Sequence, residues 1–185
     1  NPGGSGGIWE RVKVVSELDT ALQNNQNIEE IFLAAWKVFK QTDQLTVFAK
    51  LFGVRVFEKN LSPKSKKIAA DLLLLTNNFS LTKNYWKPSD LRFGLTSGDF
   101  TQVKVSSEIE KVILNVFTEV SIPFLVEQKL NQGKLGEVIL NALLQFETGI
   151  DGNLKDFSES LSTLNLIGLD TTARRAALTH LVLGK

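Results

Sequence analysis

The sequence predicts an all-α fold, a compact globular bundle of about eight helices with orthogonal or mixed packing. Apolar residues recur at intervals of three and four along most of the 185-residue chain, which is the period of helices buried on one face. Residues that typically start or stop helices separate these stretches. The alternation of apolar and polar residues that marks a half-buried strand is not convincing anywhere. Together these observations favour helices throughout.

The first half of the chain is expected to hold four helices. The first runs from Ile8 to the asparagine-rich stretch at 24–27, with an apolar face formed by Ile8, Val12, Val15, Leu18 and Leu22. Gly53, inside the third, marks either a close helix contact or a break. Caps are expected before the second, third and fourth helices, at Asn27 with Glu30, at Thr42 or Asp43, and at Ser62-Pro63.

The helical period disappears between about residues 78 and 105 and then returns. A short helix is expected after Pro88, with the surrounding aromatic residues pinning the segment to the core. Ser107 with Glu110 forms a capping-box pattern for the next helix. Further helices are expected at 124–133, 134–146 and 151–167, and finally at 171–183. The residues expected to start or end these helices are Pro123, where the chain kinks or restarts, Gly149 as a stop and Asp170 as a cap.

Residues 1–7, Asn-Pro-Gly-Gly-Ser-Gly-Gly, are interpreted as a flexible linker, because glycine gains nothing by packing and loses much entropy on ordering. The linker residues are Pro2, Gly3, Gly4, Ser5, Gly6 and Gly7. Residues 8–185 form the predicted helical domain, with possible sub-halves at 8–80 and 105–185. Methionine is absent, position 1 included, so the chain is expected to be an excised fragment, a processed product or a repeat unit.

The overall composition argues against several classes of partner and chemistry. Lys and Arg number 21 and Asp and Glu 20, a net charge of +1, which gives no general attraction to nucleic acid or anionic membranes. No apolar run approaches the roughly 20 residues of a membrane span. The absence of cysteine excludes disulfides, a thiol nucleophile and cysteine-ligated zinc. We therefore expect neither a nucleic-acid nor a membrane partner.

No residue pattern indicates catalysis, so we expect no enzyme activity, no cofactor and no metal site. His180 is the only histidine, and it is interpreted as partly exposed near a helix C-terminus, where a cation is favoured. The glycines of the linker do not resemble a phosphate loop, since no strand precedes them and Ile8-Trp9 follows them. The lysines at 64, 66, 67, 83 and 87 are interpreted as solvated rather than as a nucleic-acid surface.

The linker and the helical domain together resemble a repeat unit of a spider silk protein (spidroin). The residues that carry the resemblance are the Pro2-Gly3-Gly4 tail, the lack of Cys and Met, and Asp151-Gly152-Asn153-Leu154 followed by Phe157. The charged composition, unlike the usual Ala- and Ser-rich repeats, is most similar to an aggregate spidroin (web glue). The resemblance implies secretion to the extracellular space, tandem repetition, a structural or adhesive role without catalysis, and self-association with neighbouring repeats.

Two other interpretations remain open from the sequence. In the first, the chain is an intracellular all-α protein–protein interaction module carrying an artificial linker, with a groove lined by Trp86 and Phe93 that holds a partner helix. In the second and weaker one, residues Lys64 to Lys87 bind single-stranded nucleic acid.

Overall fold

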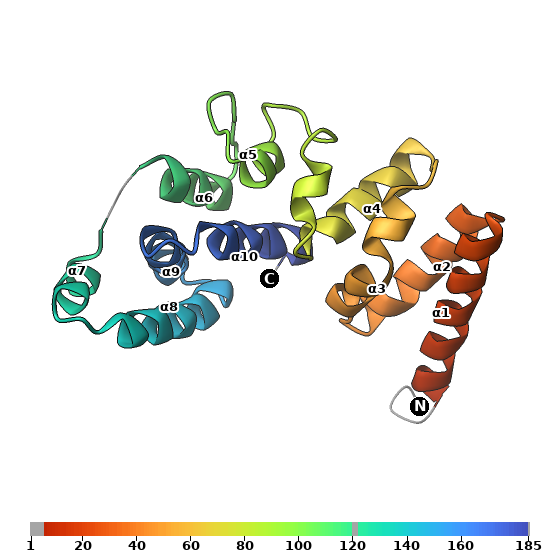
Figure 1. The fold of residues 1–185 in the computed structure, drawn as a ribbon, viewed down its shortest axis with the longest axis horizontal. Coiled ribbons are helices and arrows are strands. Elements are labelled where there is room, and N and C mark those ends of the chain that lie inside the picture. Colours follow the sequence, from red (N-terminus) through yellow and green to blue (C-terminus); the bar gives the residue numbers. More distant parts are fainter. Residues whose placement is uncertain (1–5, 120–121, 185) are drawn as a thin grey trace. The chain divides into compact units, whose positions relative to one another are not determined.

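The computed structural model describes residues 6–119 and 122–184, and these residues form helices joined by loops (Figure 1). The prediction of an all-α fold is therefore confirmed. The described residues contain ten α-helices, rather than about eight, and one 3₁₀ helix. The helices are α1 (Gly6–Asn24), α2 (Ile28–Gln41), α3 (Leu45–Phe57), α4 (Pro63–Leu74), η1 (Phe79–Thr82), α5 (Leu91–Ser97), α6 (Glu108–Thr118), α7 (Phe124–Asn131), α8 (Leu135–Ile150), α9 (Leu154–Leu166) and α10 (Asp170–Leu183).

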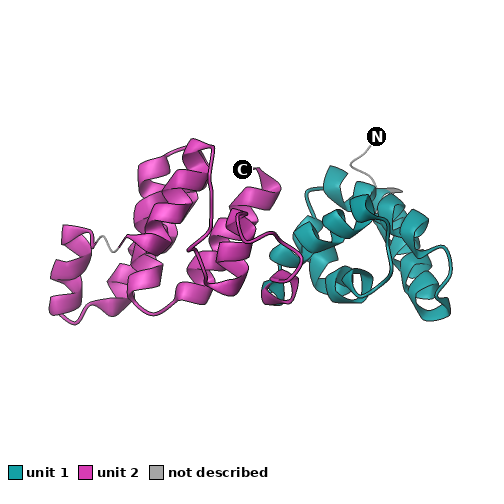
Figure 2. Cartoon of the chain, turned by 90° about the horizontal axis from the view of Figure 1, so that it is seen from above, with its two compact units in different colours: residues 1–79 teal, residues 80–185 magenta. Residues whose placement is uncertain are grey.

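The helices fall into two compact units, residues 1–79 (unit 1) and residues 80–185 (unit 2), shown in Figure 2. The boundary lies beside residue 80, where the first possible sub-half was expected to end. Residues 80–104, which lie between the two expected sub-halves, belong to unit 2. Each unit has its own buried core.

Unit 1 has an aromatic core between α2 and α3. Phe48 is fully buried at its centre, and its ring centroid lies 4.9 Å from that of Phe39, 5.6 Å from Phe52 and 6.3 Å from Phe32. Spacings of four and seven residues place these rings on the facing sides of the two helices. Gly53 marks a close helix contact, since an added Cβ would lie 3.3 Å from Leu73 of α4.

The start of α4 is fixed by hydrogen bonds that reach back to α2. As predicted, Ser62 caps the helix and its side chain accepts from the backbone N–H of Ser65. Glu29 of α2 accepts hydrogen bonds from the hydroxyls of Ser62 and Ser65, the second at 2.7 Å. The bond from Ser62, and then that from Ser65, lowers the pKa of the Glu29 carboxyl. The first turns of α4 are also tied to α3, because the Lys66 ammonium donates a hydrogen bond to the carbonyl of Phe57 at the end of α3.

Unit 2 is organised around the packed pair α8 and α9, with α6 and α10 against α9 and α7 against α8. Phe157 and Leu161 of α9 are fully buried. The hydroxyl of the buried Ser160 donates to the carbonyl of Ala142 in α8 at 2.8 Å. Gly149 was expected to end its helix, but α8 continues to Ile150. The absence of a side chain at Gly149 instead lets α9 approach, because an added Cβ would lie 2.6 Å from the backbone of Phe157.

The segment without helical periodicity is held to unit 2 by aromatic side chains, as predicted. Trp86 is only 8% exposed, and its indole N–H donates to the hydroxyl of Thr82 at 3.0 Å. The short helix expected after Pro88 is α5. Phe100 stacks on Phe117 of α6, with centroids 5.4 Å apart. The capping box of Ser107 and Glu110 at the start of α6 is also confirmed.

Three of the predicted caps are wrong. Asn27 precedes α2 with φ 50° and makes no side-chain cap bond. The residue before α3 is Gln44 rather than Thr42 or Asp43, and Asp43 has φ 55°. Asp170 is already the first residue of α10. Asn and Asp tolerate the left-handed backbone better than most residues, so Asn27 and Asp43 serve as turn residues where capping was expected.

The start of α1 also differs from the prediction. The helix begins at Gly6, so Gly6 and Gly7, which the sequence predicts in the linker, are helical. Ile8 and Val12 are 58% and 53% exposed, although the spacing predicted them on the buried face. Helix α1 has 19 residues and its neighbour α2 has 14. The first turns of α1 therefore extend past α2, and burial starts at Val14.

Candidate functional site

Helix α8 carries apolar side chains on two opposite faces. Val138, Ala142 and Gly149 are buried on the side toward α9. On the other side Leu140, Leu143 and Leu144 are 58%, 50% and 54% exposed. An apolar face that is not covered within its own unit is a candidate interaction surface.

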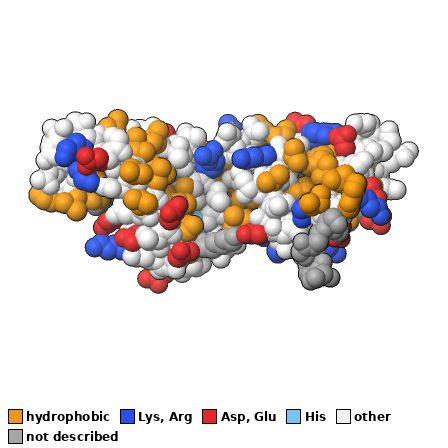
Figure 3. Space-filling view, turned by 90° about the horizontal axis from the view of Figure 1, so that it is seen from below, with side chains coloured by type: hydrophobic (Ala, Val, Ile, Leu, Met, Phe, Trp, Pro, Cys, Tyr) orange, Lys and Arg blue, Asp and Glu red, His pale blue; other side chains and the backbone are white. Residues whose placement is uncertain are grey.

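The exposed leucines form the centre of a longer stripe. At about 100° of rotation per residue, Gly136 and Glu147 project from the same side of the helix as Leu140 and Leu143. We call these four residues together with Leu144 the α8 stripe. Figure 3 shows hydrophobic side chains gathered on the face of unit 2 that carries α8. An added Cβ at Gly136 would meet nothing within 4 Å, so the stripe begins at an open position.

The two ends of the α8 stripe differ in charge. At the N-terminal end, Glu137 lies 3.8 Å from both Lys129 and Lys134, so two cations face one carboxylate. The last turn of α8 has no basic residue, while Glu147 and Asp151 are exposed there. Acidic groups at a helix C-terminus add to the negative end of the helix dipole. The stripe is therefore positive at its start and negative at its end.

Unit 1 also leaves large apolar side chains on its surface. In α1, Trp9 is 71% exposed beside Ile8 and Val12, and in α3 Val47 and Leu51 are 51% and 54% exposed. Helix α3 therefore resembles α8, since each buries one apolar face and exposes another. This pattern is typical of helices that meet further partners.

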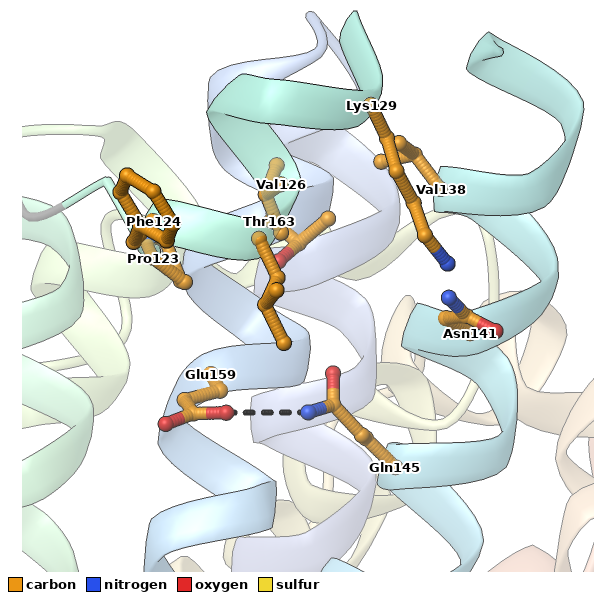
Figure 4. Close-up of a pocket in the computed structure, with 10 residues that line it drawn as sticks. Pro123, Phe124, Val126, Lys129, Val138, Asn141, Gln145, Glu159 and Thr163 are labelled. Carbon is orange, nitrogen blue, oxygen red and sulfur yellow. Dashed lines mark hydrogen bonds between the residues drawn. The ribbon is translucent and has the colours of Figure 1, made fainter.

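A pocket of about 250 Å³ lies between α7, α8 and α9 (Figure 4). One wall is apolar and comes from residues 123–126, all of them exposed or half-buried. The opposite wall carries polar groups, among which the Gln145 amide donates to the Glu159 carboxylate at 2.9 Å. The hydroxyl of Thr163 is buried there and has no hydrogen-bond partner among the described residues. Thus the pocket has an apolar side and a polar side.

The pocket is small for a ligand site. Sites for drug-sized molecules usually measure about 300–1,000 Å³, and this one is smaller. Its carboxylate is already engaged by Gln145. Its outer wall, α7, contains no buried residue. These features are those of a packing gap beneath a loosely attached helix, and the α8 stripe is the stronger candidate.

The residues singled out from the sequence do not converge on one site. Of the linker residues, Pro2, Gly3, Gly4 and Ser5 lie outside the described residues, and Gly6 and Gly7 belong to α1. Trp86 was expected to line a partner groove together with Phe93, but it is buried and hydrogen-bonded to Thr82. That part of the groove interpretation is therefore wrong.

His180 is half-buried and lies in the last turn of α10, as predicted, but it packs against an aromatic ring of α9 instead of serving as a cation. Its ring centroid lies 4.6 Å from that of Phe157, and its Nδ1 is buried without a hydrogen-bond partner among the described residues. Burial lowers its pKa below the ordinary value of 6.5, because a low-dielectric surrounding disfavours the charged imidazolium. The neutral form is favoured at neutral pH, which corrects the expected cationic role.

The predicted lysine cluster has at least one structural member. Lys66 donates to the carbonyls of Phe57 and Lys59, the latter at 3.2 Å, and its ammonium lies 4.4 Å from the Phe57 ring centroid. Lys64 and Lys67 are exposed on α4. Lys66 thus differs from the predicted solvated lysines, because it is half-buried and bonded to the end of α3, whereas Lys64 and Lys67 agree with that prediction.

The α8 stripe was missed from the sequence, although a signal was present. By their helical spacing, one core face would be formed by Leu135, Val138, Ile139, Ala142 and Leu143. Of these, Leu135 and Leu143 are about half exposed. The run Val138-Ile-Leu-Asn-Ala-Leu-Leu144 is apolar on nearly all sides, and such a helix needs cover on more than one face.

The described residues contain neither a candidate metal site nor a candidate membrane span. No group of three or more histidine or carboxylate side chains in residues 6–119 and 122–184 is placed to hold a metal ion. No helix in the same ranges is both long and apolar enough to cross a bilayer. Comparison with family models, curated proteins and solved structures gave no match to this chain.

Proposed function

We propose that the chain is a non-catalytic structural or adhesive repeat domain of a secreted, extracellular silk or glue protein. Its helical units act as folded beads, and Gly-rich stretches of sequence, such as the one that precedes α1, act as flexible linkers between successive repeats. The observation that carries the proposal is the pairing of this glycine-rich segment with helical units whose surfaces expose apolar helix faces.

The proposed role follows from the physics of beads and linkers. A Gly-rich linker extends at low force because stretching it costs only chain entropy. A folded unit resists extension until its core opens, and the Phe48 cluster and the α8–α9 pair supply such cores. Exposed faces on α3 and α8 would let neighbouring repeats adhere at high concentration. The assembly would then be extensible at first and tough once the beads unfold.

The test compares the adhesion of folded and unfolded repeats. Three copies joined in tandem are concentrated between two plates, and the work needed to separate the plates is measured. The control is the same triple repeat with Phe48→Asp and Leu161→Asp in each copy, which places a charge in the core of each unit. We expect more work for the folded repeat. Equal work for both chains would show that folded beads contribute nothing to adhesion and would contradict the proposal.

A further inference from the structure

We infer that the α8 stripe is a contact between two copies of this chain, in which two α8 helices pair in antiparallel orientation about a two-fold axis. The inference rests on the proposed function, since it supplies the contact by which repeats would adhere. Four observations lead to it: the residue pattern of the stripe, the charges at its ends, its apolar area and its exposure.

The residue pattern is complementary to itself when one helix is reversed. A two-fold axis placed midway between Asn141 and Ala142 brings Leu140 level with Leu143 of the second copy. The same axis brings Gly136 level with Glu147 of the second copy. The longest side chain of the stripe therefore meets the position that has none, where an added Cβ would meet nothing within 4 Å. Such reciprocal contacts define a closed two-fold interface.

The charges select the antiparallel orientation over the parallel one. Antiparallel pairing carries Glu147 of one copy to the start of α8 in the other. There Lys129 and Lys134 both pair with the single carboxylate of Glu137, and the N-cap residue of α8 makes no side-chain cap bond. A carboxylate is favoured at this positive helix end. Parallel pairing would place Glu147 of both copies at the same level, where like charges repel.

The area of the stripe predicts a weak contact. Three half-exposed leucines and their neighbours amount to on the order of a few hundred Å² of apolar surface. Each partner in a stable interface contributes about 800 Å². The pair should therefore form only at high protein concentration, roughly in the submillimolar range. A densely stored structural protein meets this condition, and a dilute monomer would remain unpaired.

The stripe favours a second copy over an unrelated partner because both halves of the contact are already present in one sequence. An unrelated helix would have to supply a matching gap, matching leucines and a basic start. Unit 1 of the same chain is the remaining alternative occupant. A stripe covered by unit 1 would leave the chain monomeric at every concentration, so the measurements below distinguish this alternative from pairing of two copies.

Cysteine cross-linking tests both the contact and its orientation. The chain contains no cysteine, so each introduced thiol reports one position. A mixture of Gly136→Cys and Glu147→Cys chains should form mixed disulfide dimers upon mild oxidation, because the two positions lie level in antiparallel pairing. Glu147→Cys alone should form few dimers. Efficient dimers from Glu147→Cys alone, or none from the mixture, would overturn the antiparallel pairing.

Sedimentation of the full chain over a range of concentrations tests the surface independently. We expect Leu143→Lys to weaken dimer formation at least about tenfold, because it buries an unpaired charge in the contact. The control Leu81→Lys changes a leucine of similar exposure outside α8, 54% against 50% for Leu143, and should leave association unchanged. Far-UV circular dichroism verifies that both variants fold.

The outcomes distinguish this inference from the proposed function. Association that survives Leu143→Lys would overturn the α8 contact and leave the structural role standing. A chain that stays monomeric at the highest concentrations would also overturn it. Conversely, cross-linking at 136 and 147 combined with failure of the adhesion test would uphold the α8 contact and refute the proposed function alone.

Discussion

Replacing Gly149 by alanine should destabilise unit 2, even though alanine is the better helix former. The added Cβ would lie 2.6 Å from both Cα and N of Phe157 and 2.8 Å from its Cβ. Carbon atoms in contact normally lie about 3.5–4.0 Å apart, so the overlap is about 1 Å. Two of the three opposing atoms belong to the backbone and cannot rotate away. Helix α9 would therefore have to move as a body.

That movement is costly because Phe157 is locked on several sides. Its side chain is fully buried, and its ring meets those of Phe146 at 5.8 Å and His180 at 4.6 Å. Overpacking of this kind costs about 1–3 kcal/mol, and more when backbone must shift. Against it stands a helix-propensity gain of at most about 1 kcal/mol. We expect a net loss of about 2 kcal/mol in the free energy of unfolding.

Urea unfolding followed by far-UV circular dichroism measures this effect. With a slope near 1 kcal/mol per molar urea, the midpoint of unit 2 should fall by about 2 M. Gly136→Ala is the matched control in the same helix, because its Cβ would meet nothing within 4 Å. It should raise the midpoint by up to about 1 M. If Gly149→Ala also raised the midpoint, the close approach of α8 and α9 would be refuted.

Three further predictions concern the two cores and one cap. Phe48→Ala should cost unit 1 about 3–5 kcal/mol in urea unfolding, because it removes the fully buried centre of the aromatic cluster; a loss below about 1 kcal/mol would contradict that role. Ser107→Ala should cost unit 2 about 1 kcal/mol by removing one half of the capping box with Glu110, measured as a shift in thermal midpoint; no shift would mean that the cap is not stabilising. The lowered pKa of His180 predicts that stability rises with pH between the folded-state pKa and 6.5, since the unfolded chain binds more protons in that window. The contribution of neutral His180 to the free energy of unfolding is fully present above pH 6.5 and is lost as pH falls through the folded-state pKa. NMR titration of this single histidine should give a pKa below 6.5, and His180→Leu should remove the slope; a pKa at or above 6.5 would refute the burial argument.

The elements best predicted from the sequence are those whose signals are local. Ser62-Pro63 and Ser107 with Glu110 were predicted as helix starts, and each is confirmed because a cap bonds to amides two or three residues away. The short helix after Pro88 is likewise confirmed, and its cap is also local, since Asp90 accepts from the backbone N–H of Arg92. The helical character of the chain is also predicted from a local signal, the spacing of apolar residues, which involves only residues one or two helical turns apart.

The features that were missed depend on contacts distant in the sequence. The sequence predicts Gly149 as a helix stop, but the structure shows that this glycine allows the close approach of Phe157 on the next helix. The apolar period could not distinguish the covered side of α8 from its exposed side, since both carry apolar residues. The place of His180 in the last turn predicts its partial exposure, but its lowered pKa depends on packing against α9, which the sequence does not reveal.

The loose attachment of α7 has a consequence for the time scale on which unit 2 opens. All eight of its residues are described and none is buried, and its N-cap makes no side-chain hydrogen bond. Helices this short are marginal when they stand alone, so α7 should belong to the part of the unit that opens most easily. Its amides should exchange with deuterated water well before those of α9. The pocket beneath it would then exist only between successive openings, and its lifetime, more than its volume, would limit what it can hold.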